Sequence, residues 1–276
     1  LRQGSMFDTR EGTTKGKGLL GSGLFGSKTS TNITDSGVLI NATFADLAST
    51  TSGAAIQFYE DVTITKKKWY GSSKTSYRRN LETADQITQD YFKDIFSNAT
   101  ELFIEIGQDA GMQAEQVLSS LSGVSFENLS VSLRGLKGED LEKELNAVIG
   151  SMLDQGAEAV FSQFMQFEEF GEGMLETVIR VTDNNRKVKQ ALSNLGIGTL
   201  QNVVGIASYE ITEALVEAAG GIQDFLAKAE DYRENFLTEA ERLAPIQLEV
   251  SAEIARIAKL GFTSADGLVD TRQEFK

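Results

Sequence analysis

The spacing of hydrophobic residues changes along this chain, from every second position in the first part to helical spacing in the rest. Segments around residues 38–44, 56–58 and 62–64 alternate apolar and polar side chains, which predicts half-buried antiparallel strands. From Glu139 onward, apolar residues recur three and four positions apart, which predicts amphipathic helices. We therefore expect an α+β fold that is mainly α-helical, with a small antiparallel β-sheet in the N-terminal half.

Two further signals extend the predicted sheet. The segment WYGSSKTSY, residues 69–77, places a Gly-Ser-Ser turn between aromatic residues, as in a β-hairpin. Leu129, Val131 and Leu133 alternate with polar residues, which predicts a strand that returns to the same sheet. The sheet would then combine strands far apart in the sequence, with a helix between them.

That intervening helix is predicted at about residues 84–107. Thr83 and Gln86 have the spacing of a capping box. The apolar positions that follow recur at helical spacing and are Ile87, Tyr91, Ile95, Ala99, Leu102 and Ile106. We expect this apolar stripe to pack on one face of the sheet.

Several helices are expected in the second half of the chain. One apolar stripe comprises Leu141, Leu145, Val148, Met152 and Val160, and the next comprises Leu175, Val178, Val181, Val188, Leu192 and Leu195. Gly196 follows the second stripe at the position of a C′ residue, and Gly220 and Gly221 end a later helix. Pro245 lies inside the start of the last helix, which predicts a kink or a restart there.

These patterns divide the chain into three regions. Residues 1–34 are expected to form a Gly/Ser/Thr-rich linker or arm, because the segment has almost no periodicity. Residues 35–136 are expected to hold the sheet with its packed helix, and residues 137–276 to form a helical region. The chain opens on Leu1 instead of a methionine, so we expect a fragment of a longer protein.

The chain contains neither cysteine nor histidine. Disulfides, Cys/His zinc sites and nucleophilic arrangements that need either residue are therefore excluded. The net charge of −14 is unevenly spread: residues 1–80 hold 11 Lys+Arg and 6 Asp+Glu, a net +5, which leaves −19 for residues 81–276. DNA would be repelled by the larger part, because neutralising phosphates needs clustered cations.

Four carboxylates crowd the entry to a predicted helix; they are Glu168, Glu169, Glu172 and Glu176. Paired carboxylates can carry out acid-base cleavage of a glycosidic bond. Acidic side chains near a helix N-terminus also stabilise the helix dipole, by about 0.3–1 kcal/mol each. We favour the dipole interpretation and predict no catalytic, cofactor-binding or metal-binding residue, and no cofactor.

A basic aromatic segment is the first candidate for contact with a partner, and it comprises Lys66, Lys67, Lys68 and Trp69. Some proteins that bind single-stranded nucleic acid interleave cations and aromatic side chains in this way. A hairpin tip whose lysines prevent edge-to-edge pairing has the same composition. We favour the hairpin tip.

A phenylalanine stripe is the second candidate, with one residue at every third position: Phe161, Phe164, Phe167 and Phe170. Such a stripe usually belongs to a core. It would bind a partner if the fold left it uncovered. Both interpretations stay open at this point.

Several blocks of the sequence, in the same order, resemble one region of phage tail tape measure proteins. They are LFGSKTSTNITDSGVLI, KKKWYGSSKTSY, VSLRGLKGEDLEKELNAVIGSMLDQGAEA, GEGMLETVIRV, YEITEALVEAAGGIQDF and ENFLTEAER. The matches are spread over residues 24–276. None of them is a catalytic signature, so their order carries the resemblance.

The resemblance implies a structural virion protein and no enzyme. Tape measure proteins are long, largely helical chains that occupy the tail tube lumen, set tail length during assembly and leave ahead of the genome during ejection. The implied partners are other copies of the protein and the tail tube and distal tail tip proteins, with DNA met only indirectly and transient membrane contact made through parts outside this chain. The implied location is the virion, in the tail tube lumen or tail tip, and the host cytoplasm during assembly.

A length ruler needs long, unbroken helix at about 1.5 Å per residue. Glycines at 171, 173, 196, 198, 205, 220 and 221 interrupt this chain, and glycine weakens a helix interior. We therefore expect a globular or tip-proximal segment, distinct from the ruler. The alternative function is part of a phage-borne, carboxylate-dependent cell-wall glycosidase.

Overall fold

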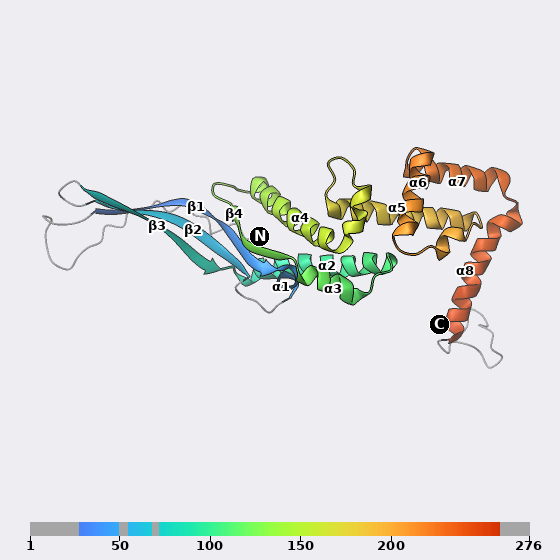
Figure 1. Ribbon diagram of the computed structural model, residues 1–276, viewed down its shortest axis with the longest axis horizontal. Coiled ribbons are helices and arrows are strands. Elements are labelled where there is room, and N and C mark those ends of the chain that lie inside the picture. The colour runs from blue at the N-terminus through green and yellow to red at the C-terminus, as the bar shows by residue number, and fades with distance from the viewer. Residues whose placement is uncertain (1–27, 50–54, 68–71, 260–276) are drawn as a thin grey trace. The chain divides into compact units, whose positions relative to one another are not determined.

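A computed structural model describes residues 28–49, 55–67 and 72–259. Of these residues, 63% are helical, and a four-stranded antiparallel sheet lies in the N-terminal half (Figure 1). The predicted α+β, mainly helical fold is confirmed. The chain divides into two compact units: the sheet unit, Leu1–Gly107 with Gln113–Ser162, and the helical unit, Gln108–Met112 with Gln163–Lys276.

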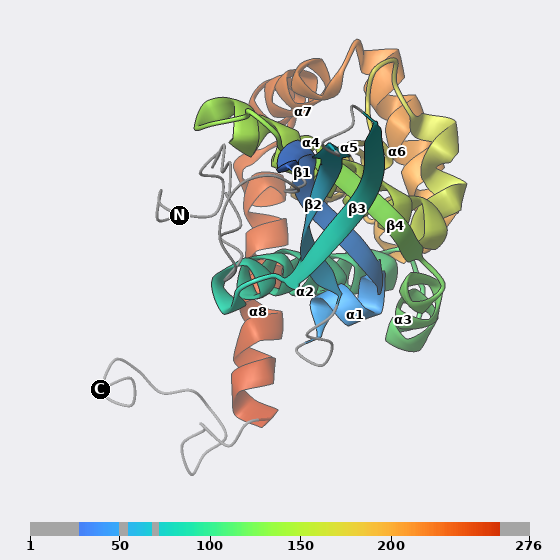
Figure 2. The same cartoon turned by 90° about the vertical axis from the view of Figure 1, so that its left-hand side faces the viewer.

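The sheet has the strand order β3-β2-β1-β4. Its strands are β1 (Lys28–Thr43), β2 (Ile56–Lys67), β3 (Ser73–Thr83) and β4 (Ser125–Ser132). The strands twist relative to one another, as Figure 2 shows. The predicted hairpin is confirmed, because Lys67 pairs with Ser73, and so is the returning strand, because Val131 of β4 pairs with Val38.

Two predicted regional boundaries differ from those of the structure. Residues 28–34 of the predicted arm belong to β1, while residues 1–27 lie outside the described part. The helix α4 (Glu139–Phe161) belongs to the sheet unit, so the division falls after Ser162 and not after residue 136. Sequence periodicity gave α4 the same appearance as the later helices, because periodicity does not report what a helix packs against.

Within the described residues of the sheet unit, three helices precede α4: α1 (Phe44–Ala48), α2 (Gln86–Asp109) and α3 (Ala114–Ser122). The start of α2 differs from the prediction: Thr83 ends β3, and the Asp85 carboxylate instead accepts a hydrogen bond of 2.8 Å from the Thr88 amide. The predicted buried face is also wrong in part, since Ile87 is 70% exposed and Tyr91 is 47% exposed.

The buried face of α2 carries Phe92, Phe96 and Phe103 instead. Phe96 packs edge-on against Phe44 of α1, with ring centroids 4.8 Å apart, and contacts Phe126 of β4 at 6.3 Å. We refer to these buried rings and their neighbours as the phenylalanine core. It joins the strand end where β1 pairs with β4 to helices α1 and α2.

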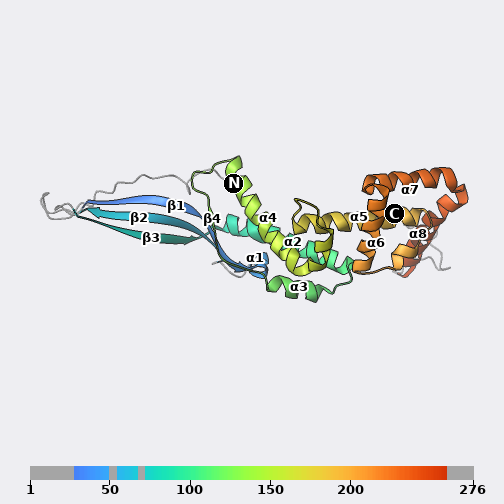
Figure 3. The same ribbon diagram turned by 45° about the horizontal axis from the view of Figure 1, so that its top comes forward.

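Strands β1, β2 and β3 continue beyond the helices of the sheet unit as a three-stranded ribbon (Figure 3). The strand β4 pairs only with the second half of β1, from Gly37 to Thr43. Every residue of β3 is exposed except Asn80, which is half-buried. The ribbon therefore presents a free strand edge and solvent-accessible side chains.

The helical unit contains the helices α5 (Met174–Asn194), α6 (Ile206–Ala219), α7 (Ile222–Phe236) and α8 (Glu239–Lys259). It also contains two 3-10 turns, η1 (Ser162–Phe167) and η2 (Thr199–Asn202), and η1 begins at the last residue of the sheet unit. Val188, Leu200 and Val216 form a buried cluster. Both predicted glycine ends are confirmed: Gly196, which follows the C-cap Leu195 of α5, has a φ angle of 73°, and Gly220, the C-cap of α6, has a φ angle of 94°.

A pair of glycines in α4 tests the phenylalanine core. A Cβ atom at Gly156 would lie 2.5 Å from Cε2 of the fully buried Phe44, whereas one at Gly150 would meet nothing within 4 Å. Gly156→Ala should lower the free energy of unfolding by about 1–3 kcal/mol, because overpacking outweighs the gain in helix propensity. Gly150→Ala should raise it by up to about 1 kcal/mol. Urea unfolding compares the two, and equal stabilisation by both would contradict the packing.

Candidate functional site

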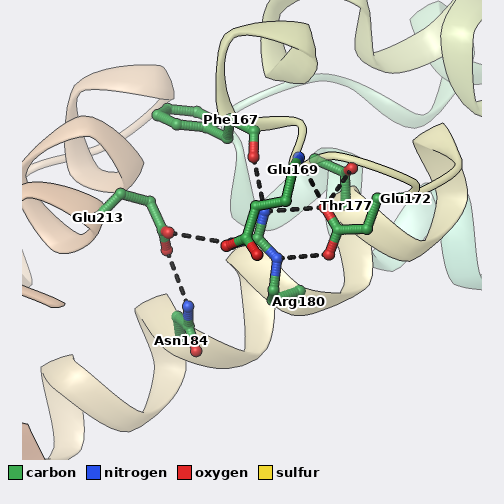
Figure 4. Close-up of polar contacts among 7 residues, drawn as sticks. All are labelled: Phe167, Glu169, Glu172, Thr177, Arg180, Asn184 and Glu213. Atoms are coloured by element: carbon green, nitrogen blue, oxygen red, sulfur yellow. Dashed lines mark hydrogen bonds and ion pairs between the residues drawn. The ribbon is translucent and has the colours of Figure 1, made fainter. Parts of the chain in front are cut away.

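A network centred on Arg180 of α5 is the most extensive polar arrangement that the described residues form (Figure 4). The guanidinium donates from Nε to Glu172 Oε1 at 2.6 Å and from Nη2 to Glu172 Oε2 at 2.9 Å. Nη2 also donates to the carbonyl oxygen of Phe167 at 2.6 Å. The two parallel bonds to Glu172 form the bidentate geometry that is strongest between arginine and a carboxylate.

Other helices of the same unit complete the network. Nη1 of Arg180 lies 3.2 Å from Glu213 of α6 and 3.4 Å from Glu169. Asn184, one turn along α5, donates to the other oxygen of Glu213 at 3.1 Å. The network thus links the segment before α5, α5 itself and α6.

The Glu172 carboxylate is strongly stabilised in its ionised form. The hydrogen bonds from Arg180 lower the pKa of Glu172 to about 2, against the opposing effect of burial, and the hydroxyl of Thr177 assists by donating at 2.8 Å. The same pairing raises the pKa of Arg180. The side chains of Glu172 and Arg180 are only 13% and 23% exposed.

This arrangement corrects the interpretation of the glutamate cluster. Glu172 does not act simply through the helix dipole, because it forms a direct, largely buried ion pair. A general acid in glycoside cleavage needs a raised pKa, and the shift in Glu172 has the opposite direction. The network therefore has the chemistry of a structural clamp between helices and gives the glycosidase alternative no support.

A second polar cluster lies on one face of the sheet around Tyr59. Its hydroxyl donates to Asp35 at 2.9 Å, and Ser132 of β4 donates to the same carboxylate at 2.5 Å. The Arg79 guanidinium lies 4.4 Å from the centre of the Tyr59 ring and forms two bonds to Asp61, at 2.7 and 2.6 Å. Burial, with the hydrogen bond to Asp35, raises the pKa of Tyr59 to about 12. These contacts tie all four strands together.

The predicted basic segment falls near the end of the ribbon. Lys66 and Lys67 are exposed on β2, while Lys68 and Trp69 lie outside the described residues. The register places Lys66 directly opposite Lys74 of β3, and like charges at such positions repel. Sequence reasoning missed Lys74 as a member of this group, although the hairpin register could have identified it.

A groove lies on the face of the ribbon that carries Lys66 and Lys74, and it extends away from these two lysines. Its lining comprises Thr31, Ile33, Glu60, Val62, Ile64, Arg78 and Asn80. Strand alternation puts Lys66 on the same face as Ile64, whereas Lys67 points to the opposite face. The groove thus has an apolar floor, with Arg78 along one side, the lysines at one end and Glu60 toward the other end.

The phenylalanine stripe is divided between the two units. Phe161 and Phe164 are fully buried and are therefore not available to a partner: Phe161 packs against Phe103, and Phe164 packs against Tyr209. Phe167 is half-buried, and Phe170 is fully exposed. The core interpretation holds for the first two residues, and only Phe170 remains as an accessible contact.

Helices α7 and α8 expose a group of apolar side chains that the prediction did not include. No residue of α7 is buried, and none of the α8 residues whose side chains are described is buried. The most exposed members are Phe236 (69%) and Leu248 (73%). These helices therefore leave apolar surface in contact with water.

No family model, curated protein or solved structure matches the chain. Within the described ranges, no cluster of acidic side chains has the arrangement of a metal site. None of the helices described here is long and apolar enough to cross a membrane.

The Arg180 clamp predicts a pH-dependent contribution to stability. At pH 7, Glu172→Gln should lower the free energy of unfolding by about 1–3 kcal/mol, because it leaves a largely buried guanidinium short of its partner. Folding lowers the pKa of Glu172 from 4.5 to about 2, so this contribution is present above pH 4.5 and is lost as the pH falls toward 2.

Urea unfolding at pH 7 and pH 3 measures this difference, with Glu176→Gln as the matched control. Glu176 is exposed in the first turn of α5, so its substitution should change the free energy of unfolding by less than about 0.5 kcal/mol. A Glu172→Gln deficit that does not narrow at pH 3, or equal effects of the two substitutions, would contradict the clamp.

Proposed function

We propose that this chain is a segment of a phage tail tape measure protein, a structural virion protein that acts in tail assembly, length determination and genome ejection. The sequence blocks spread over residues 24–276 support the proposal, because they resemble blocks of that family and occur in the same order. The observation that carries a structural role is that α7, α8 and the ribbon leave apolar and charged side chains uncovered. Such surfaces are typical of proteins that assemble with partners.

The segment would act near the tip of the tail and not as the ruler. The longest helix among the described residues, α2, has 24 residues and spans about 36 Å at 1.5 Å per residue. The helices on either side of the Arg180 clamp fold back on one another, as the contacts from α5 to α6 require. A packed unit of this kind suits attachment to tail tip proteins better than measurement of length.

The partners of the segment would be other copies of itself, tail tube proteins and distal tail tip proteins. It would be located in the tail tube lumen or tail tip of the virion, and in the host cytoplasm during assembly. The −19 charge of residues 81–276 would limit adhesion to the genome, because like charges repel.

Electrostatic docking of the basic N-terminal part on acidic tail proteins gives a measurable expectation. The purified chain should bind tail tip or tail tube proteins at low salt, and the affinity should fall as salt approaches ~1 M, where the screening length is about 3 Å. Binding to immobilised tail proteins across a salt series measures this. If the chain binds no tail protein at any salt concentration but binds DNA tightly, the proposed class of partner is wrong.

The glycosidase alternative makes a different prediction, which a peptidoglycan zymogram tests. A structural segment should produce no clearing at any pH. Clearing that disappears in a folded Glu169→Gln or Glu176→Gln variant would favour the enzyme.

A further inference from the structure

We propose that the ribbon groove of one copy of this chain binds the exposed face of α7 and α8 of a second copy. The two surfaces belong to different units of the chain and are both uncovered. They are complementary in charge and in apolar content. The inference does not depend on the tail assignment, since it concerns only the chain's own surfaces.

The outer part of the ribbon groove supplies cations beside an apolar floor. Lys66, Lys74 and Arg78 share the face of the lining residues Val62 and Ile64, and the acidic lining residue Glu60 lies farther along β2, on the side away from the lysines. Arg79 is occupied by Asp61, whereas Lys66, Lys74 and Arg78 are exposed and form no ion pair with any described residue. The repulsion between the paired lysines 66 and 74 would be relieved by a carboxylate placed near both.

The helices α7 and α8 supply the opposite surface. Among the exposed carboxylates there, Asp224, Glu234 and Glu239 form no ion pair with a described residue. Tyr232 and Phe236 stack with ring centroids 5.2 Å apart in the second half of α7 and are 48% and 69% exposed. Along α8, the exposed apolar residues Leu243, Ile246, Val250 and Ile254 recur three and four positions apart. An amphipathic helical surface of this kind fits a groove with an apolar floor.

The pairing would be heterologous, because a copy offers its ribbon to the helices of the next one. Each bound pair would still have one free ribbon and one free helical surface. Such contacts build open chains unless the rotation between copies closes a ring. Self-association should therefore continue beyond a dimer as the protein concentration rises.

Light scattering and sedimentation of the full chain over a concentration series test the proposal. Lys66→Ser combined with Lys74→Ser should weaken self-association by about five- to tenfold, as expected for the loss of two exposed ion pairs. Lys67→Ser is the matched control for Lys66→Ser alone, because each removes one positive charge, from opposite faces of β2, and Lys67→Ser should have the smaller effect. Circular dichroism checks that each variant folds.

Mixing two variants distinguishes this geometry from other modes of association. The first variant is Lys66→Ser with Lys74→Ser, which weakens the ribbon surface. The second is Phe236→Ser with Val250→Ser, which should disable the helical surface while leaving the ribbon intact. At a protein concentration between the dissociation constants of the wild-type chain and of the lysine 66/74 variant, each variant alone should be mostly monomeric. An equimolar mixture should then form mainly a 1:1 dimer, through the intact helical surface of one variant and the intact ribbon of the other.

Three results would overturn the proposal: a wild-type chain that is monomeric at every concentration and salt, equal effects of Lys66→Ser and Lys67→Ser, or mixed variants that fail to pair. A loss of self-association would not decide whether the chain binds tail proteins, because the salt series with immobilised tail proteins tests that separately. Tail binding without self-association would therefore reject this inference and retain the proposed function.

Discussion

Burial of Phe44 is the interaction on which the sheet unit depends. This residue begins α1 directly after β1 and is fully buried. The centre of its ring lies 4.8 Å from that of Phe96 and 6.0 Å from that of Phe103. A close approach of the α4 backbone is possible only because residue 156 is a glycine. The end of the sheet, α1, α2 and α4 therefore share one aromatic core. The ribbon extends from this core, and the helices of the sheet unit do not cover it.

The helical unit is organised differently, around a charge and not around aromatic rings alone. Arg180 binds Glu172, Glu213 and the carbonyl of Phe167, so one side chain fixes the segment before α5 against both α5 and α6. The desolvation cost of a buried guanidinium is offset only when several acceptors surround it. Glu172 and Glu169 of the four-carboxylate cluster bind Arg180, whereas Glu168 and Glu176 are exposed and lie outside this network.

The surfaces that remain uncovered follow from how these two cores are built. The phenylalanine core stops where β4 ends, and the clamp lies among α5 and α6, so neither core reaches the outer ribbon or the exposed faces of α7 and α8. Both exposed regions combine charge with apolar side chains. A surface of this composition is solvated in isolation and can be buried by a complementary partner, which connects the fold to assembly.

The sequence by itself determined the type and order of the elements, because periodicity and turn residues act locally: it located the hairpin before Ser73, the returning strand at Val131 and the glycine end at Gly196. It did not determine which face of α2 is buried, since Tyr91 and Phe96 lie on stripes that both have helical spacing and only packing against Phe44 separates them. The exposed lysines were predicted as a tip group, but Lys74 joined them through strand register. The partners of Arg180 were decided by tertiary structure alone, because an ion pair between helices depends on distances that no local pattern contains.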